Sequence, residues 1–501
     1  MALSAFGALL LGIVTVFGFA PFSASALPVL TLAGLFALWR RASTPSAAGW
    51  IGFAFGAGLF GAGVSWVYVA LSGFGEMPPV LAAIATVCFC AYLALFPALA
   101  GWCSVRLALA GSGLRLALAA PLWTLGEWLR SWLLSGFTWL SLGYSEQTAA
   151  LGGYAPIGGV LLVSLAIAAA AALLVHATLA VEEHRFSIAA VDVAALVAAG
   201  ALGVVLSTVE WSRPSGEPIA VSLVQGNIPQ DVKFDPQYRA SSLSTYADLV
   251  ARAKGRLIVL PESALPMFAD EVPAEYVAAL RELARKNGAD ILVGLFFFEP
   301  RAGTDEDDRY FNSVVSLGAA TTQVYRKRHL VPFGETIPLK PLFGWFIRSV
   351  LNIPLADQMP GPAYQAPFAV AGERVAVNIC YEDAFADVIN RSLPEATLLV
   401  NVTNDAWYGR SLAAEQHEQI AAMRALETSR PMLRATNTGI TSIIDHRGIE
   451  VARLPWFTRG VLEGRIAGRA GTTPYVRFGD ALVVVAALLM IGAVVLLRRL
   501  A

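Results

Sequence analysis

The chain has 501 residues, of which 56% are hydrophobic and only 15% are charged, and its formal net charge is −1. Soluble globular proteins carry about 25% charged residues, so this composition excludes a protein that is soluble along its whole length. The near-neutral charge gives no basic excess of the kind that attracts nucleic acid, and we expect no nucleic-acid partner.

Apolar runs near the length of a membrane-spanning helix occur eight times, seven before residue 208 and one after residue 480. A helix needs about 20 predominantly apolar residues to cross a bilayer. The runs are Ala5–Phe19, Ala26–Leu38, Ile51–Leu71, Val80–Cys103, Leu116–Leu134, Ala155–Leu179, Ile188–Ser207 and Ala481–Leu497. We therefore predict a membrane α-helical bundle of about eight spans, with about seven helices in residues 1–208 and a C-terminal helix at 480–499.

Basic residues are distributed unevenly among the loops of this bundle. With a cytoplasmic N-terminus, the outer loops PFSAS, SGFGEMPP and SGFTWLSLGYSEQ contain no lysine or arginine. The inner loops and the C-terminal tail contain Arg40, Arg41, Arg106, Arg115, Arg185, Arg498 and Arg499. This asymmetry is typical of multi-pass proteins, whose cytoplasmic loops are basic. It predicts that both termini are cytoplasmic and that residues 217–470 lie on the extracytoplasmic side.

Residues 217–470 have the composition of a soluble domain with its own core. Strand-like runs alternate with amphipathic stretches, which favours a layered α/β domain. The predicted strands are IAVSLVQ, RLIVLPE, ADILVGLFFF, NSVVSLG, TQVYRK, RVAVNICYE, ATLLVNVTN and GITSIID. The predicted helices are Ser241–Ala253, Ala274–Lys286 and Leu412–Ser429.

The four cysteines fall into two groups. Cys88, Cys90 and Cys103 share one apolar run, where we interpret them as packing residues, because no histidine or carboxylate lies near them to complete a metal site. Cys380 is alone in the soluble segment, so it has no partner there for an internal disulfide. We expect no metal and no cofactor.

Three polar residues end apolar strands where catalytic groups of α/β proteins collect: Glu262, Lys327 and Cys380. Singly, each has an ordinary explanation as a solvated cap, a surface lysine or a core thiol. Together they form an acyl-transfer set without histidine, since a carboxylate can take the thiol proton and an ammonium can stabilise a thiolate or an oxyanion.

The motifs around these residues resemble those of the nitrilase superfamily: LPES, YRKRHLVPFGE and NICYED. Together with the apolar runs and the segments VQGNIP, VTNDAWYG and LRATNTGIT, the whole chain is similar to the apolipoprotein N-acyltransferase family. The resemblance implies an α-β-β-α sandwich for the soluble domain. It also implies that Glu262 is the general base, Cys380 the nucleophile and Lys327 the oxyanion stabiliser, with Glu335 supporting the lysine.

The resemblance implies roles for further residues. Tyr381 and Glu382 match two residues behind the nucleophile on which the family depends, and Trp407 fits a family motif where it is expected to line the substrate pocket. Phe234 stands where the family commonly has tryptophan. A phenylalanine keeps the aromatic surface but lacks the indole N–H donor, so we expect an apolar wall for an acyl chain there rather than a hydrogen bond.

The family's reaction is a two-step acyl transfer in the bacterial inner membrane, with the catalytic domain periplasmic. The resemblance implies that Cys380 takes the sn-1 acyl chain of a phospholipid, typically phosphatidylethanolamine, as a thioester. The N-terminal amino group of an S-diacylglyceryl-cysteine apolipoprotein then takes the chain from the thioester. The partners expected are the phospholipid, the apolipoprotein and the bilayer, and a monomer is the default because no dimerisation signal is evident.

Two other functions compete with this interpretation. A membrane-tethered nitrilase-like amidase that hydrolyses a small amide or nitrile would use the same three residues, because water as well as an amine can capture a thioester. A small polar substrate, however, needs neither eight spans nor an apolar arm. A transporter with an external sensory domain would need polar residues along its helices, and apart from Glu127 and Arg130 the apolar runs contain almost none.

The insertion Pro338–Leu355 is apolar and aromatic, and we predict an arm at the membrane surface that gates the lipid opening. Trp345 and Phe346 are expected to bind lipid there, although a core helix explains the same pattern. Replacing both with serine should impair turnover of lipid substrates in a detergent assay while circular dichroism remains unchanged. Unchanged turnover would contradict the gating role.

Overall fold

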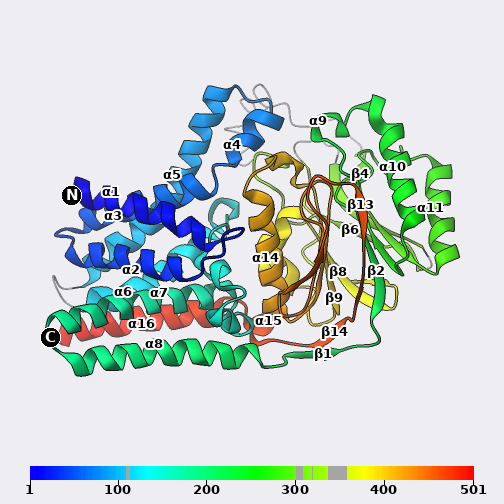
Figure 1. The fold of residues 1–501 in the computed structure, drawn as a ribbon. Coiled ribbons are helices and arrows are strands. Elements are labelled where there is room, and N and C mark those ends of the chain that lie inside the picture. Colours follow the sequence, from blue (N-terminus) through cyan, green and yellow to red (C-terminus); the bar gives the residue numbers. More distant parts are fainter. Residues whose placement is uncertain (109–112, 301–308, 319, 337–357, 501) are drawn as a thin grey trace. The chain divides into compact units, whose positions relative to one another are not determined.

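A computed structural model describes residues 1–108, 113–300, 309–318, 320–336 and 358–500. The chain forms two compact units, whose elements are labelled in Figure 1. The helical unit comprises Met1–Tyr68, Val80–Glu210 and Thr473–Ala501. The α/β unit comprises Trp211–Thr472 together with Val69–Pro79, a segment that we had predicted to belong to the bundle.

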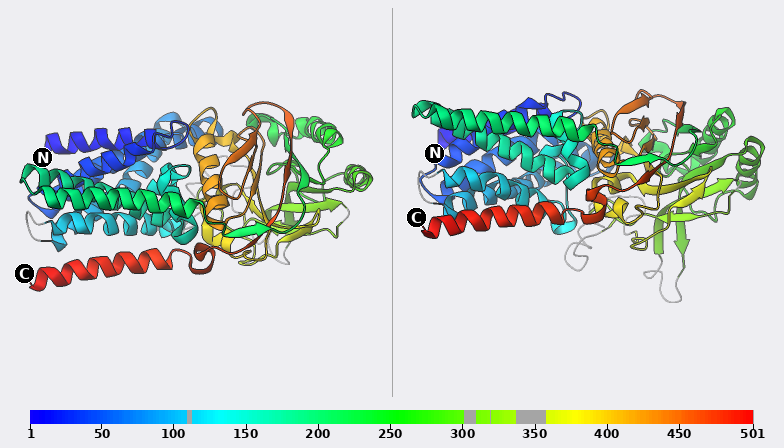
Figure 2. Two further views of the ribbon diagram at one scale, coloured as in Figure 1. Left: turned by 60° about the horizontal axis from the view of Figure 1, so that its bottom comes forward. Right: turned by 90° about the horizontal axis from the view of Figure 1, so that it is seen from below.

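The predicted helical bundle is confirmed, and each apolar run corresponds to one helix. The helices are α1 (Ala2–Thr15), α2 (Ala26–Arg41), α3 (Pro45–Gly63), α5 (Pro79–Leu107), α6 (Leu114–Arg130), α7 (Ala155–Glu182), α8 (Phe186–Ser207) and α16 (Ala481–Leu500). Figure 2 shows them side by side, with the start of α1 and the end of α16 at the same end of the helical unit.

The number of spans is approximate, because the helices differ in length and hydropathy. Within the described residues, five helical stretches are long and apolar enough to cross a membrane by themselves: Pro45–Gly63, Pro79–Leu107, Ala150–Glu182, Phe186–Ser207 and Ala481–Arg499. The third predicted run differs most, since α3 ends at Gly63 rather than at Leu71. A short α4 (Val67–Val69) and a π-helical turn η2 (Ala70–Phe74) follow, and the apolar composition continues through this break without marking it.

Glycines let α1 and α3 pack closely. A Cβ atom at Gly12 would lie 2.0 Å from the carbonyl oxygen of Phe55, and one at Gly58 would lie 2.1 Å from that of Leu9. Small residues at helix contacts allow the backbones to approach, which is how apolar helices associate where lipid provides no hydrophobic driving force. Any larger residue at either glycine must push the two helices apart.

Two buried charges fix the loop that follows α6. Glu127 accepts a hydrogen bond from the amide of Leu142 at 2.9 Å, and Arg130 donates to the carbonyls of Phe137 and Trp139 at 2.5 and 2.8 Å. Ionisable residues within apolar bundles are costly unless such partners satisfy them. Here Glu127 and Arg130 form hydrogen bonds with backbone groups of an irregular segment. These contacts indicate that the two charged side chains have a structural role.

The α/β unit contains two six-stranded sheets and a two-stranded ribbon of β1 (Ser212–Pro214) and β14 (Arg469–Gly471). The first sheet, in spatial order, is β13 (Gly460–Ile466), β2 (Ile219–Gln225), β3 (Leu257–Val259), β4 (Asp290–Glu299), β5 (Arg309–Gly318) and β6 (Val324–Arg326). The second is β12 (Glu450–Arg453), β11 (Ser442–Ile444), β10 (Met432–Thr436), β9 (Leu398–Thr403), β8 (Glu373–Ile379) and β7 (Phe368–Val370).

Helices cover both sheets on their outer faces. The helices α10 (Arg239–Arg252) and α11 (Ala274–Asn287) pack on the first sheet, and α13 (Ala386–Asn390) and α14 (Ala413–Thr428) on the second (Figure 1). The two sheets face each other, as the contact of β2 with β10 shows. The predicted α-β-β-α sandwich is therefore confirmed.

Three parallel strands form the centre of each sheet: β2, β3 and β4 in the first, and β8, β9 and β10 in the second. Strands covered on both faces read as continuous apolar runs, which is why most of them are evident in the sequence. The strand β6 is antiparallel to β5, and β5 is antiparallel to β4, so β6 runs parallel to β4. The carboxyl ends of β3, β4 and β6 therefore meet at one edge of the first sheet.

The strands that sequence analysis did not predict are β1, β7, β10, β12, β13 and β14. The strand β10 is the most instructive, because it is fully buried yet reads MLRAT with a charge at its centre. Buried Arg434 interrupts the apolar pattern by which a central strand is recognised. Its burial is possible only because carboxylates from other elements neutralise it, and a local pattern cannot indicate those partners.

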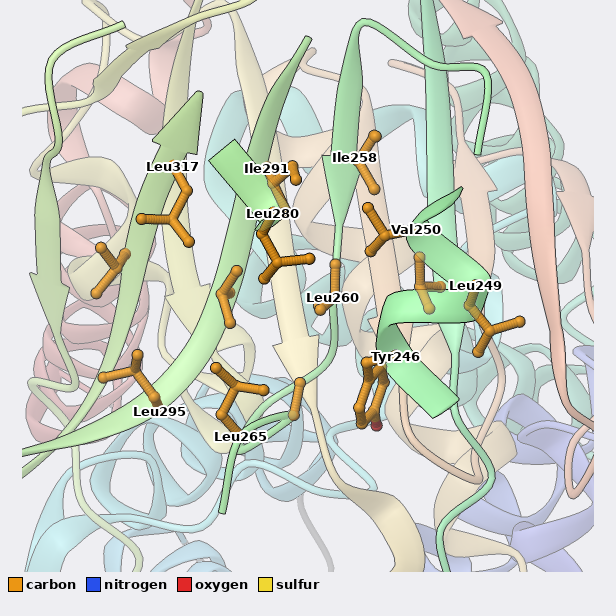
Figure 3. Close-up of a cluster of buried hydrophobic side chains, with 14 of the residues drawn as sticks. Tyr246, Leu249, Val250, Ile258, Leu260, Leu265, Leu280, Ile291, Leu295 and Leu317 are labelled. Atoms are coloured by element: carbon orange, nitrogen blue, oxygen red, sulfur yellow. The ribbon is translucent and has the colours of Figure 1, made fainter. Parts of the chain in front are cut away.

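The core of the first layer lies between the first sheet and its two helices. Figure 3 shows Val250 of α10 next to Ile258 of the sheet and Leu280 of α11 next to Ile291, with Leu249 of α10 in the same cluster. The helix α11 ends at Asn287 and is capped by Gly288, whose left-handed φ of 58° is suited to a residue without a side chain. This layer fixes β3, whose carboxyl end carries part of the candidate site.

We predict that Leu280→Ala destabilises the α/β unit by about 2–5 kcal/mol, because it leaves a cavity in this core. The readout is thermal unfolding in detergent, followed by near-ultraviolet circular dichroism. Glu282→Ala, at an exposed position of the same helix, is the matched control and should change the melting temperature little. Equal melting temperatures for the two variants would show that α11 does not stabilise the sheet.

Candidate active site

Three predicted site residues lie at the carboxyl ends of strands. Glu262 follows β3, Lys327 follows β6, and Cys380 begins the 3₁₀ turn η8 (Cys380–Ala384) directly after β8. The exposed fraction is 6% for Glu262, 1% for Lys327 and 6% for Cys380. The first two come from one sheet and Cys380 from the other, so the cluster joins both layers of the sandwich.

Lys327 is held by two carboxylates. Its Nζ atom lies 2.6 Å from Oε1 of Glu335 and 3.3 Å from Oε1 of Glu262. The side-chain amide of Asn312 donates to the same two oxygens, at 3.3 Å to Glu335 and 2.7 Å to Glu262. The other oxygen of Glu335 accepts from the amide of Val331. An ammonium has three donors, so this arrangement leaves one N–H for a further acceptor.

These charges determine the protonation of Lys327. Burial disfavours its charged form, but Glu262, Glu335 and the Cys380 side chain more than offset burial, and the pKa of Lys327 is raised above its ordinary value. The lysine is therefore a fixed cation at every physiological pH. It can stabilise negative charge without exchanging its own proton.

Cys380 has an unusual backbone and an unreactive resting thiol. Its φ is +52°, a region that residues with side chains seldom adopt and that marks functional sites. Burial raises the pKa of the thiol well above its usual range and Glu262 raises it further, whereas Lys327 and a hydrogen bond from Thr403 lower it. The thiol is thus protonated at rest, and a reaction at sulfur needs a base such as the neighbouring Glu262 carboxylate.

Glu382 binds the two sheets together next to Cys380. Its Oε1 atom accepts from the amides of Arg328 at 2.6 Å and His329 at 3.0 Å, directly after Lys327. Its Oε2 atom accepts from the amide of Ile379 at 2.7 Å and from the hydroxyl of Tyr325 at 2.9 Å. Burial raises the pKa of Glu382 to about 7 and the amide donors oppose that rise. Through these four donors, the buried carboxylate links the segment after Lys327 to the turn that carries Cys380.

Tyr381 has a different environment. Its ring packs against Phe385 at 4.9 Å and against His329 at 5.7 Å between ring centroids, and His329 in turn stacks on Phe385 at 3.6 Å. This aromatic group closes one side of the turn that carries Cys380. The adjacent residues Tyr381 and Glu382 therefore lie in different surroundings: the Tyr381 ring is in an aromatic group, and the Glu382 carboxylate is among hydrogen-bond donors.

The predicted substrate-binding residues are only partly described. Phe234 is half-buried beside Phe296, with ring centroids 6.2 Å apart. Trp407, also half-buried, contacts Phe74 edge to face at 6.3 Å, and Phe74 belongs to the segment Val69–Pro79 that is part of the α/β unit. The predicted lipid-binding residues Trp345 and Phe346 lie outside the described residues.

Sequence analysis missed several polar residues of this region. Lys233, at the end of the short helix α9 (Gln230–Lys233), is 2% exposed and donates from Nζ to the carbonyl oxygen of Glu262 at 3.0 Å. Burial lowers its pKa to about 8, although Glu262 and Cys380 act in the opposite direction. The others are Asn312, Asn401, Asp383, Asp405, His417 and Arg434. Three of them could have been recognised from the sequence, because each is a polar residue within an otherwise apolar strand: Asn312, Asn401 and Arg434.

No group of three or more histidine, cysteine or carboxylate side chains is placed to hold a metal ion in the described part of the chain. The acidic residues near Cys380 are instead engaged by lysine, arginine, histidine and backbone amides. The chemistry that this arrangement can perform is thiol-based: a buried nucleophile, a carboxylate base and a fixed cation.

Comparisons with protein families match most of the chain. The family model described as carbon-nitrogen hydrolase matches residues 220–475. The model described as the apolipoprotein N-acyltransferase N-terminal domain matches residues 11–173. The two matches fall largely in the α/β unit and the helical unit, respectively.

Two relatives are similar over nearly their whole length. The apolipoprotein N-acyltransferase of Nitrosomonas europaea is 49% identical over 474 residues, which cover 94% of this chain and 93% of that protein. The apolipoprotein N-acyltransferase of Methylococcus capsulatus is 45% identical over 475 residues, which cover 94% of this chain and 91% of that protein. Among solved structures, the C. elegans NitFhit protein is 18% identical with a TM-score of 0.38, covering 50% of this chain and 61% of that one.

We predict that Lys233→Met changes how stability depends on pH. Between pH 8 and the ordinary lysine pKa of 10.5, the unfolded chain binds a proton that native Lys233 has released, so this residue makes stability rise with pH. Relative to the wild type, the variant should therefore lose on the order of 3 kcal/mol of stability between pH 7 and pH 10, because its own stability lacks this rise. Melting temperatures of both proteins across this range provide the test.

The matched control is Lys254→Met, at an exposed lysine of the same unit. It should follow the wild type at every pH. A constant difference between Lys233→Met and the wild type would contradict the buried, perturbed environment of Lys233.

Proposed function

This chain belongs to the apolipoprotein N-acyltransferase family, and on that premise we propose how its residues carry out acyl transfer. The resemblance inferred from its motifs is thereby confirmed. Within that family the chain is an acyltransferase of lipoprotein maturation, and its substrates are lipid and lipoprotein. The residue roles, the donor lipid and the orientation in the membrane are our proposals.

In the first half-reaction, Glu262 takes the thiol proton of Cys380 as the sulfur attacks the sn-1 ester carbonyl of a phospholipid. The carbonyl oxygen becomes an oxyanion, which the free N–H of Lys327 stabilises. The C–O bond then breaks, and Glu262 returns the proton to the departing lysophospholipid oxygen. The products are a Cys380 thioester and a lysophospholipid.

In the second half-reaction, the α-amino group of an S-diacylglyceryl cysteine attacks the thioester. Glu262 accepts a proton from the attacking nitrogen, the C–S bond breaks, and the proton passes to the Cys380 sulfur. A new amide bond joins the acyl chain to the lipoprotein, and the enzyme returns to its resting state. One carboxylate thereby serves both steps in turn.

The observation that carries this proposal is the buried cluster of Lys327, Glu262 and Glu335 with its electrostatic effect on Cys380. An ordinary core thiol has no reason to lie beside both a carboxylate and a fixed ammonium, because burying those charges is costly. Glu335 and Asn312 keep Lys327 and Glu262 aligned. These contacts support a base, a nucleophile and an oxyanion donor with distinct tasks.

The surrounding residues have supporting roles in this proposal. Glu382 aligns the lysine segment with the nucleophile, and Tyr381 closes the side of the turn. Phe234 and Trp407 would line the path of the acyl chain as apolar walls, as would Trp345 and Phe346 of the arm. Hydrocarbon exposed to water costs about 0.8 kcal/mol per methylene, so an acyl chain needs such walls outside the bilayer.

We further propose phosphatidylethanolamine as the donor and a monomer as the active form. The chain would span the bacterial inner membrane several times, with both termini in the cytoplasm and the α/β unit in the periplasm. The arginine asymmetry of the loops supports this orientation. The nitrilase-like amidase alternative is less supported, because the two relatives described above match nearly the full length of the chain and are named apolipoprotein N-acyltransferases.

Intact-mass measurement of the purified protein after incubation with phosphatidylethanolamine tests the mechanism. We expect the mass to increase by one acyl chain, and hydroxylamine to remove the adduct because it cleaves thioesters. The adduct should be absent from Cys380→Ala. It should persist in Cys103→Ala, a matched loss of a half-buried thiol in α5. A wild-type protein that forms no adduct under any lipid condition would sink the thioester mechanism.

A further inference from the structure

Four ionisable side chains lie buried behind the nucleophile, and the proposed chemistry uses none of them. Asp383, Asp405, His417 and Arg434 each have an exposed side-chain fraction of 1% or less. They come from four separate elements: η8, the turn η9 (Asp405–Tyr408), α14 and β10. Burying four charges is unfavourable unless they neutralise one another, so their presence requires a reason.

The four side chains form a closed ring of ion pairs. His417 binds Asp405 through Nδ1 at 2.8 Å and Asp383 through Nε2 at 2.9 Å. Arg434 binds Asp383 and Asp405 through its two terminal nitrogens, both at 3.0 Å. Each base thus contacts both acids. The ring is electrically neutral when His417 carries its second proton.

The surroundings of His417 favour the protonated form. Its Nδ1 faces a carboxylate, and its Nε2 faces a carboxylate and a carbonyl oxygen, all of which are acceptors. Both ring nitrogens must therefore act as donors, and only the imidazolium has two N–H groups. Burial and Arg434 lower the pKa of His417, but Asp383 and Asp405 outweigh them and raise it to about 9.

This ring holds Cys380 by its main chain. The carbonyl oxygen of Cys380 lies 3.3 Å from Nε2 of His417 and accepts a hydrogen bond from Nδ2 of Asn401 at 3.1 Å. Asn401 is itself oriented by Arg434, which donates to its Oδ1 at 2.7 Å. Asp383 lies in the same 3₁₀ turn as Cys380. The ring therefore contacts the nucleophile turn at two points, a carbonyl and a carboxylate.

The backbone of Cys380 explains why such a hold is needed. A φ of +52° is costly for a residue with a side chain, and it persists only where the surrounding structure over-determines it. Without the ring, the turn would relax toward ordinary backbone angles and carry the sulfur away from Glu262 and Lys327. A shift of about 1 Å in a reacting atom can lower a rate about a hundredfold.

We propose that the Asp383–Asp405–His417–Arg434 ring, acting through His417 and through Asn401, positions Cys380 for attack. His417, Arg434 and Asn401 are positioning residues that touch no substrate. The inference rests on the proposed role of Cys380 as the acylated nucleophile. The proposal gives a function to His417, which the acyl-transfer steps do not use. It also explains why β10 carries an arginine at its buried centre.

The test is the kinetics of acyl-adduct formation in His417→Gln, in the full-length protein with phosphatidylethanolamine. Glutamine is neutral, and its two N–H donors are on one nitrogen rather than on the two opposite ring nitrogens of His417, so the ring loses a charge and its hydrogen-bond geometry. We expect the rate constant of acylation to fall about ten- to a hundredfold. The amplitude of the adduct and the lipid concentration that gives half-maximal rate should remain within about twofold of the wild type.

Amplitude and rate together separate positioning from simple stabilisation. If the ring served stability alone, fewer molecules would fold, the amplitude would fall, and the folded molecules would react at the wild-type rate. That result would overturn the proposal. Glu427→Gln, which breaks the buried Arg424–Glu427 ion pair of the same helix, is the matched control and should leave the rate constant unchanged.

A second variant covers the case in which His417→Gln does not accumulate as folded protein. Asn401→Ser removes the other donor to the Cys380 carbonyl and keeps all four charges, and it should also slow acylation at full amplitude. Wild-type rates in this variant would overturn the proposal while the thioester mechanism stood. A wild-type protein without any adduct would instead remove the mechanism, and this inference with it.

Discussion

The burial of the Lys327 ammonium is the constraint on which the rest of the active site depends. A cation that is 1% exposed must be compensated by nearby negative charge, and Glu262 and Glu335 provide it within 3.3 Å. To do so, the ends of β3 and β6 must lie at the same edge of the first sheet, with Asn312 of β5 between them. The strand order of this sheet is therefore what allows the carboxylates to neutralise Lys327.

The second sheet meets that requirement through backbone contacts. Glu382 accepts amide hydrogens from both sides of the junction, from the segment after Lys327 and from Ile379 before Cys380. The charged ring around His417 holds the same turn from behind. The proposed reactive groups are only three, Glu262, Lys327 and Cys380, and a larger number of side chains and backbone groups align them. Such preorganisation lowers the cost of bringing charges into place during the reaction.

The helical unit and the α/β unit answer different physical needs of an acyltransferase with lipid substrates. Long apolar helices such as α5 and α7 are suited to a lipid environment. The close contact of Gly12 with Phe55 lets α1 and α3 pack where lipid provides no hydrophobic driving force. The α/β unit has a dry core and charged clusters of the kind found in soluble enzymes. In the proposed reaction, acyl chains that come from lipid must react with groups that are fixed in the α/β unit.

The sequence by itself determined the features that depend on local composition: the apolar runs, the central strands other than β10, and the motifs carrying Glu262, Lys327 and Cys380. It also placed Glu382 behind the nucleophile but did not separate its role from that of Tyr381. Only the tertiary structure showed that Glu382 bridges two segments, that α3 ends at Gly63, and that Asp383, Asp405, His417 and Arg434 form a ring. Those four residues are spread over some fifty positions, and they meet only because two turns, a helix and a strand pack beside the second sheet in its folded register. Register is a property of the folded sheets, so no local pattern in the chain could have revealed it.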